Sequence, residues 1–385
     1  LWLRPARAAR GGNPARPAVW VILDGSRQLG TDAGANDIGR AQAALARHLA
    51  AQHKPPAGAD RPDQLLVDEV MTAYLSEHAA RSPSRDWIAH TAAPILDWWS
   101  GKRLDEVSGP TCRAYVDWRT AQAVKRIKTG PARTVSDQTA RHELKTLRTA
   151  INYYHAEQGP LLSVPKVTLP APTPQKDDYY LTRSEAAARI WAARQREETR
   201  HVARLILIGI YSGTRPGAIL KLQWLPSISG GWADVDNAVL HRRGIGARRS
   251  RKRQPPAAIH VRLLPHLRRW KRIDAAIGAT HIVHYRGAAV AKLRRSWGSV
   301  RALAVAALTR ALKTRRLNLP PNALTRIDAP HIVRHTAATW QMQSGTELAE
   351  AAGYLGMTPE TLWTVYGHHS PHFQKTASQS RGRRA

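Results

Sequence analysis

One arginine lies at a junction between two apolar segments, where its side chain can do chemistry on an anion. The segment Ser212–Trp224 ends one expected helix at Gly213 and begins an amphipathic one that packs through Leu222 and Trp224, among others. Such a junction can place Arg215 at a cleft, with its guanidinium free to bind a phosphate through two parallel hydrogen bonds. The alternative is a surface arginine beside a helix cap.

A histidine and a second arginine follow, three residues apart. The sequence around His331-Ile-Val-Arg334-His-Thr indicates a helix whose start is marked by Asp328 and Pro330. At this spacing, His331 and Arg334 project from one face and can converge on one phosphate. A solvated polar face is the alternative.

A tyrosine stands at the exit of a further short helix. Thr358 is the expected N-cap of that helix and Pro359 its first residue, and the helix ends at Tyr366. We expect the Tyr366 hydroxyl to be exposed and mobile there. A free phenol has a pKa near ~10, so it acts as a nucleophile at pH 7 only beside groups that stabilise negative charge.

The order of these pieces resembles the tyrosine recombinase or phage integrase family. Arg215 stands in Gly-Thr-Arg-Pro-Gly, His331 and Arg334 stand in His-x-x-Arg-His-Thr, and Leu-Gly-Met-Thr follows with Tyr366 nine residues beyond Met357. The resemblance covers Gln64 to about Phe373. It implies a core-site DNA-binding domain followed by a catalytic domain.

The chemistry that the resemblance implies is DNA strand transfer by a site-specific recombinase. In this family a tyrosine, here Tyr366, attacks a DNA phosphodiester to give a 3′-phosphotyrosine and a free 5′-hydroxyl, without metal, ATP or another cofactor. Arg215 and Arg334 would hold the non-bridging oxygens, and His331 would bind the phosphate or shuttle the tyrosine proton. The implied partner is double-stranded DNA, bound by a homotetramer on two recombination sites.

The family also uses a lysine on a strand turn as general acid for the departing 5′-oxygen. A basic run between two expected strands contains one lysine, Lys252, and the arginines Arg248, Arg249, Arg251 and Arg253. Lys252 is the sensible acid, because an arginine with a pKa above ~12 does not readily give up a proton. The alternative is that the whole run only contacts the phosphate backbone.

One position departs from the family pattern. Many members carry His or Trp after the Leu-Gly pair, bonded to the scissile phosphate, and here the residue is Met357, which has no donor. The chain manages with fewer donors, or His368 or His369 approaches from beyond Tyr366, or activity is reduced. A binding-only relic and a topoisomerase-like nicking and closing enzyme therefore stand as alternatives to an active recombinase.

Two regions precede the expected catalytic domain. Residues 1–55 form a hairpin over Ala18–Gly30 and a helix over Ile38–Gln52. The hairpin either presents Trp20, Arg27 and Gln28 to accessory DNA or caps the fold. Residues 63–160 form an all-α bundle of four or five helices, with Ser136 as an N-cap.

The remaining chain holds a linker and the catalytic domain. Residues 161–180 are rich in proline and should be extended, which would let a DNA clamp open. Residues 181–385 form an α+β domain with strands over Trp232–Arg243 and Ala257–Leu264, helices from Pro265 onward and a basic C-terminal tail. The fold class is thus mostly α with small β elements.

Charge favours a polyanionic partner. The formal net charge is +31, and the 32 residues from His241 to Arg272 hold twelve Lys or Arg and no Asp or Glu. Arg141, Lys145 and Arg148, on the helix after Ser136, would add contacts to duplex DNA. An anionic membrane surface is the other candidate, but no run reaches the ~18 apolar residues of a membrane span.

Cysteine content excludes two further classes. The single cysteine, Cys112, forms no internal disulfide and no Cys-based zinc site, so we expect a reducing cytoplasm and no bound metal. The Arg-rich stretch Leu1–Arg16 superficially suggests a transit peptide, but strand-like sequence follows it at once. Because the chain begins with Leu1 rather than methionine, we expect its natural start to lie upstream.

Overall fold

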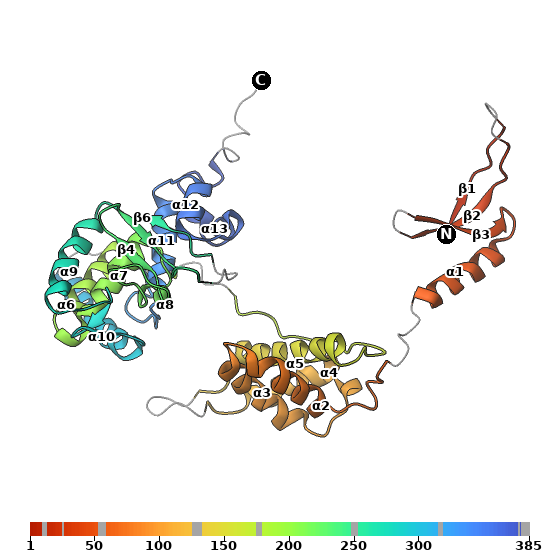
Figure 1. Ribbon diagram of the computed structural model, residues 1–385, viewed down its shortest axis with the longest axis horizontal. Coiled ribbons are helices and arrows are strands. Elements are labelled where there is room, and N and C mark those ends of the chain that lie inside the picture. The colour runs from red at the N-terminus through yellow and green to blue at the C-terminus, as the bar shows by residue number, and fades with distance from the viewer. Residues whose placement is uncertain are drawn as a thin grey trace. The chain divides into compact units, whose positions relative to one another are not determined.

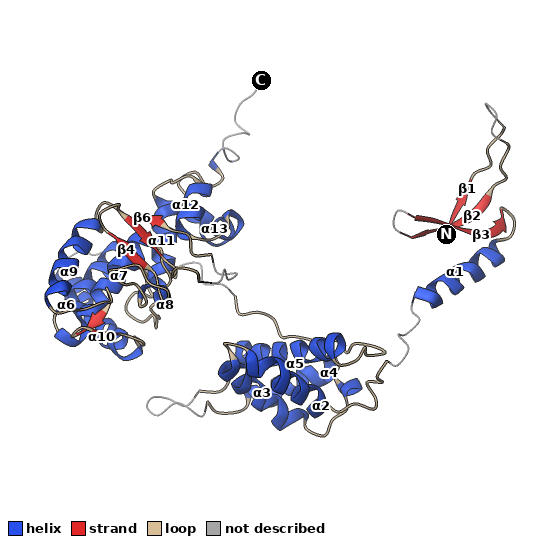
Figure 2. Cartoon of the chain, viewed as in Figure 1, coloured by secondary structure: helices blue, strands red, loops and turns tan. Residues whose placement is uncertain are grey.

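The structure is a computed structural model that describes residues 1–9, 14–24, 27–52, 59–124, 133–174, 179–247, 253–314, 319–375 and 378. The chain divides into two compact units, Leu1–Pro174 and Gln175–Ala385 (Figure 1). Helices dominate and the strands are short (Figure 2), so the predicted class is confirmed. Of the helices in these ranges, none combines the length and apolar content that a bilayer crossing requires.

The first unit begins with a small sheet and one helix: β1 (Trp2–Arg4), β2 (Val19–Asp24), β3 (Arg27–Gly34) and α1 (Ile38–Gln52). The sheet is antiparallel in the order β1-β2-β3. The sequence did not predict β1, because a three-residue strand is stabilised by its pairing with β2 rather than by its own composition. Arg27 and Gln28 are exposed, whereas Trp20 is half-buried and donates its indole N–H to the Ala35 carbonyl.

The helical part of the first unit contains α2 (Val67–Ala73), α3 (Arg85–Trp99), α4 (Gly109–Thr120) and α5 (Asp137–Glu157). The Ser136 side chain accepts the Thr139 N–H at 3.4 Å, which confirms the predicted N-cap of α5. Trp99, Tyr115 and Leu144 are fully buried between the helices. The apolar faces of these helices therefore form one core.

Between residues 162 and 174 the proline-rich segment forms neither helix nor strand, and it packs with the helices. Val167 is 2% exposed in their core. Arg148 on α5 donates to the Val167 carbonyl, and Arg141 donates to the Pro170 carbonyl. Residues up to Pro174 thus belong to the first unit rather than to a free linker, and two of the three proposed DNA-binding cations on α5 bind their own chain. Lys145 is exposed.

The second unit is built around α7, most of whose residues are buried. Its helices are α6 (Arg183–Arg194), α7 (Arg200–Ser212), α8 (Pro216–Ile219), α9 (Leu264–Ala276), α10 (Arg294–Thr314), α11 (Ile332–Gln343), α12 (Leu348–Leu355) and α13 (Pro359–Tyr366). Both α6 and α11 pack directly against α7. Reciprocal hydrogen bonds between Thr182 and Glu185 start α6.

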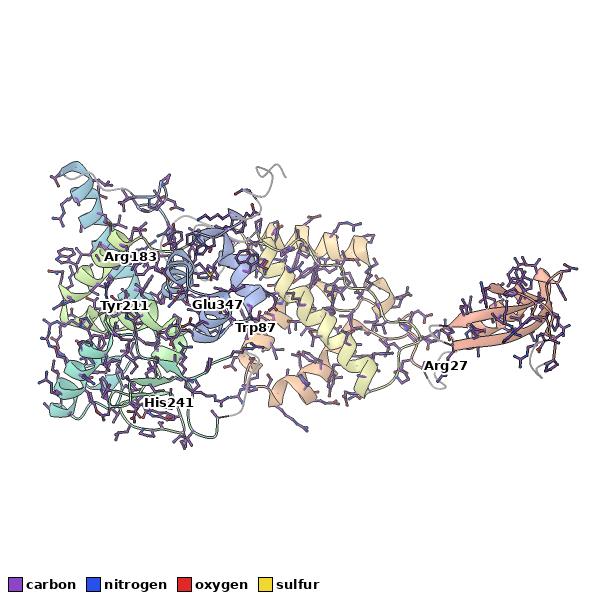
Figure 3. All side chains as sticks on the ribbon, turned by 90° about the horizontal axis from the view of Figure 1, so that it is seen from above. Arg27, Trp87, Arg183, Tyr211, His241 and Glu347 are labelled. Carbon is purple, nitrogen blue, oxygen red and sulfur yellow. The ribbon has the colours of Figure 1, made fainter. Side chains whose placement is uncertain are left out.

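The strands of the second unit are shorter than predicted. They are β4 (Trp232–Asp234), β5 (Val239–His241), β6 (Ala257–Ala258), β7 (His284–Tyr285) and β8 (Ala288–Ala289). Trp232 stacks on His241 with ring centroids 4.1 Å apart (Figure 3, where His241 is labelled). The strand expected to run through Leu264 ends at Ala258, and a turn at residues 261–263 then leads into α9. The β7–β8 hairpin interrupts the helices expected from Pro265 onward.

The amphipathic helix predicted to run through Trp224 is wrong. The helix α8 stops at Ile219, and Gln223 then pairs with a strand: its N–H donates to the Gly231 carbonyl at 2.9 Å and its carbonyl accepts from Ala233 at 3.1 Å. Leu222 and Trp224 are buried all the same. The burial of these apolar residues was therefore predicted correctly. The helix was not, because main-chain hydrogen bonds to the neighbouring strand hold this segment extended.

Candidate active site

A cationic cleft of about 1150 Å³ opens in the second unit. Its basic lining residues are Arg215, Lys221, Arg242, Arg243, Arg294 and Arg301. Asp328 is the one acid among the described lining residues, and it is paired with the buried Arg189 at 2.5 Å. The cleft therefore attracts a polyanion.

A glycine turn places Arg215 at this cleft. Gly213 ends α7 with φ +63°, and a Cβ there would lie 2.3 Å from the Leu355 side chain, so only glycine fits. Arg215 then precedes α8 and donates its Nη1 to the Arg253 carbonyl at 2.9 Å. Burial lowers the pKa of the Arg215 guanidinium from its ordinary value.

Arg334 is buried next to the cleft rather than in its lining. Its Nη1 donates to the carbonyls of Gly213 and Leu355, and its Nη2 donates to the Gly356 carbonyl at 3.4 Å. Desolvation, followed by the charges of Arg215 and Arg242, lowers the pKa of Arg334 to about 10. The side chain thus stays protonated at pH 7, in an environment that opposes its charge.

His331 lies at the start of α11 and lines the cleft, with its side chain exposed. Desolvation of the imidazole, followed by the charges of Arg334 and Arg215, lowers the pKa of His331 from its ordinary value. The structure therefore brings Arg215, His331 and Arg334 together. The expected helix start at Asp328 is wrong, because the Asp328 carboxylate is bound by Arg189 and by the Trp297 indole instead of capping the helix.

Sequence reasoning missed a third arginine of this cluster. Arg242, which follows β5, is 3% exposed and donates its Nη2 to the Ser212 carbonyl at 2.5 Å. Its Nε has no hydrogen-bond partner among the described residues, and desolvation lowers the pKa of Arg242 to about 10. The basic run from His241 to Arg272 contains Arg242, but nothing in the sequence distinguishes it from the other cations there.

Tyr366 is buried, so the predicted exposed and mobile hydroxyl is wrong. The residue is 8% exposed because α13 packs on α11 and α12 through an apolar cluster that includes Ala338, Leu355 and Leu362. Desolvation raises the pKa of Tyr366 to about 12, and Arg334 partly offsets this rise. Its Oη lies 2.8 Å from Nδ1 of His335.

His335, which sequence reasoning also missed, lies among three rings. Its ring centroid is 5.2 Å from those of His331 and Tyr179 and 5.9 Å from that of Tyr366. Desolvation, then the charges of His331 and Arg334, lower the pKa of His335 to about 4. The available signal was its position directly after Arg334 and one helical turn after His331, which puts it on the inner face of α11.

The remaining predicted positions are only partly described. Arg248, Arg249, Arg251 and Lys252 lie outside the described residues, whereas Arg253 is described and contacts Arg215 through its carbonyl. Met357 packs against the apolar cluster under α13. His369 stacks edge to face on Tyr180 at 5.0 Å, and His368 is exposed.

Comparison with solved structures places this fold in a class: the chain has the fold of the tyrosine recombinases. It is similar to the Tn1549 transposon integrase in complex with transposon right end DNA, with 13% identity and a TM-score of 0.58 over 83% of this chain and 99% of that one. It is also similar to a lambda integrase dimer bound to a COC′ core site (14%, 0.51, 95% and 93%) and to a lambda integrase tetramer bound to a Holliday junction (16%, 0.50, 95% and 93%). No protein-family model and no curated protein matches the sequence.

Proposed function

We propose that this protein is a site-specific DNA recombinase that cuts and rejoins DNA through a 3′-phosphotyrosine on Tyr366. The observation that carries the proposal is the gathering of Arg215, His331 and Arg334 around one cationic cleft, with the Tyr366 hydroxyl within electrostatic range of Arg334. The fold, shared with integrases solved on DNA, supports the choice of substrate.

The arginines supply the charge that the reaction needs. Burial lowers the pKa of all three arginines, Arg215, Arg242 and Arg334, and neighbouring arginine charges lower the pKa of Arg242 and Arg334 further. The three positive charges therefore repel one another. A phosphate bound there would be held by Arg215 and Arg334 through its non-bridging oxygens. The same donors would stabilise the additional negative charge of the five-coordinate transition state.

The covalent step conserves the energy of the phosphodiester. Tyr366 Oη attacks phosphorus, the bond to the 5′-oxygen breaks, and the 3′-phosphotyrosine is later reopened by a 5′-hydroxyl, so the exchange requires neither ATP nor a metal. We assign the proton for the departing 5′-oxygen to Lys252. This choice is supported by its neighbour Arg253, whose carbonyl binds Arg215.

We further propose that the active assembly is a homotetramer on two duplex sites. The support is the similarity to lambda integrase, whose solved structures include a dimer on a core site and a tetramer on a Holliday junction. Mass photometry of the protein on a synthetic Holliday junction should show four chains per junction. One chain per junction at saturation would contradict the tetramer.

Covalent capture on DNA tests the function itself. Duplexes of random sequence would carry a 5′-bridging phosphorothiolate, whose thiol leaving group rejoins poorly and traps the adduct. Wild-type protein should form a detergent-stable adduct with a subset of sequences, and Tyr366→Phe should form none. Adducts of equal yield from both proteins would exclude Tyr366 as the nucleophile, and no adduct from either would exclude strand transfer.

A second candidate is a DNA-binding protein without strand transfer. It is favoured by Met357, which puts an apolar side chain where many recombinases carry a donor. It predicts salt-sensitive DNA binding by both proteins and no adduct. A topoisomerase-like enzyme would instead relax plasmids that lack every sequence found by covalent capture. Plasmid relaxation therefore separates such an enzyme from a recombinase.

A further inference from the structure

His335 touches the hydroxyl oxygen of the proposed nucleophile. Its Nδ1 lies 2.8 Å from Tyr366 Oη, across the contact between α11 and α13. Both side chains are held in place: Tyr366 by the apolar cluster under α13, and His335 by the rings of Tyr179 and His331. The hydrogen bond is therefore a fixed feature of the site and not a chance surface contact.

The surroundings decide which partner donates. Burial, followed by the charges of His331 and Arg334, disfavours a positive charge on His335, so the imidazole is neutral at pH 7. Burial keeps the proton on the Tyr366 hydroxyl. A neutral phenol beside a neutral imidazole donates its O–H, and Nδ1 accepts it.

We propose that His335 is the general base that takes the proton of Tyr366 during DNA cleavage. The inference rests on the proposed recombinase function. As the Oη–phosphorus bond forms and the bond from phosphorus to the 5′-oxygen breaks, the Tyr366 proton moves to His335 Nδ1 and the 5′-oxygen takes a proton from Lys252. On rejoining, both protons return.

Bound DNA reduces one part of the barrier to this transfer. In the free protein, desolvation by burial and then the charges of His331 and Arg334 oppose an imidazolium at position 335. A phosphate held by Arg215 and Arg334 adds negative charge nearby and so favours the protonated form in the transition state. The two histidines then have different roles. His331, exposed in the cleft, contacts the phosphate, and His335 accepts the proton of the nucleophile Tyr366.

Two substitutions separate a base from a positioning group. In His335→Asn, the amide oxygen can replace Nδ1 as the acceptor for the Tyr366 hydroxyl but cannot take up its proton. His335→Ala removes both properties. We expect both variants to form the adduct roughly 10²–10⁴-fold more slowly than wild type, with unchanged DNA affinity, on a nicked all-oxygen duplex of a sequence that wild-type protein cleaves. His335→Asn should keep the melting temperature, whereas His335→Ala should lower it because the buried Tyr366 hydroxyl loses its acceptor.

The phosphorothiolate duplex locates the defect. A sulfur leaving group needs no proton, so a Lys252→Ala variant should recover on it, whereas the His335 variants should stay slow because their defect lies at the nucleophile. Wild-type rates in both His335 variants, a wild-type rate in His335→Asn alone, or faster cleavage in either would overturn the proposal. Failure of wild-type protein to form any adduct would instead overturn the recombinase function on which the proposal rests.

Discussion

Arg334 holds a positive charge in a place that opposes it. The side chain is 5% exposed, and the charges of Arg215 and Arg242 act against its protonated form. Three carbonyls bind the guanidinium and compensate part of this cost. The negative charge of an incoming phosphate would offset the repulsion among these cations.

Arg215→Lys tests the need for a planar guanidinium. A lysine keeps the charge but loses the two parallel donors, so we expect adduct formation to slow by about 10²–10³-fold while DNA affinity changes little. The measurement is single-turnover cleavage of a duplex whose sequence forms the covalent adduct with wild-type protein. Arg268→Lys, on the exposed face of α9, is the matched control and should cleave at the wild-type rate.

The lowered pKa of His335 predicts acid sensitivity of the fold. Between the ordinary histidine pKa of about 6.5 and the folded value of about 4, the unfolded chain binds a proton that the folded chain does not. The contribution of His335 to the free energy of unfolding is therefore complete above pH 6.5. It is lost as the pH falls through this window, by at most about 3 kcal/mol. The melting temperature of wild type should fall more steeply with acidification than that of His335→Asn, and parallel curves would contradict the shift.

Features that depend on neighbouring residues, such as helix caps, were predicted well from the sequence. Contacts between residues far apart in the chain were not. The caps at Ser136 and Thr358 depend on the next few residues, and both are present. The hydrogen bond between Tyr366 and His335 joins residues that are 31 positions apart in the chain. No spacing rule reports such a contact, and for the same reason Arg242 could not be singled out.

At the scale of elements, a buried ion pair fixes the approach to α11. Arg189 on α6 binds Asp328 at 2.5 Å, with both side chains almost wholly buried, and the Trp297 indole on α10 donates to the same carboxylate at 2.9 Å. The helices α6 and α10 and the segment before α11 therefore meet at Asp328, three residues before His331. This contact sets where the end of α11 that carries His331 lies.

Asp328→Asn should destabilise the protein, because it leaves the Arg189 charge buried without its partner. We expect a loss of about 3–5 kcal/mol, read from urea denaturation of the full chain followed by circular dichroism. The control is Asp105→Asn, whose partner Arg103 is exposed, and there the loss should stay below about 1 kcal/mol. Equal losses from the two variants would mean that the buried pair does not anchor α11.

The turn between α7 and α8 depends on one glycine. Gly213→Ala would put a methyl group 2.3 Å from Leu355 and force a positive φ on alanine, so we expect it to cost more than about 1 kcal/mol. Gly217→Ala meets open space at an ordinary φ and should change stability by less than about 1 kcal/mol. Comparing the melting temperatures of the two variants checks the requirement.

For the whole molecule, the net charge of +31 predicts DNA binding that weakens strongly with salt. If the basic run touches the DNA backbone, replacing Arg248, Arg249 and Arg253 by alanine should flatten the slope of log affinity against log salt concentration. The change should be about 0.9 for each phosphate that the variant no longer neutralises. Fluorescence anisotropy on a random duplex measures this slope. An unchanged slope would show that the run does not touch DNA.

The carbonyl cradle of Arg334 bears on how far such a protein can diverge. Gly213, Leu355 and Gly356 bind the guanidinium through main-chain oxygens, so these contacts depend on the path of the backbone and not on side-chain chemistry. Substitutions at neighbouring positions can therefore accumulate without displacing the arginine, provided that the backbone path is kept. At Gly213 and Gly356 that path has a positive φ, so these two glycines are the positions of the cradle least open to substitution.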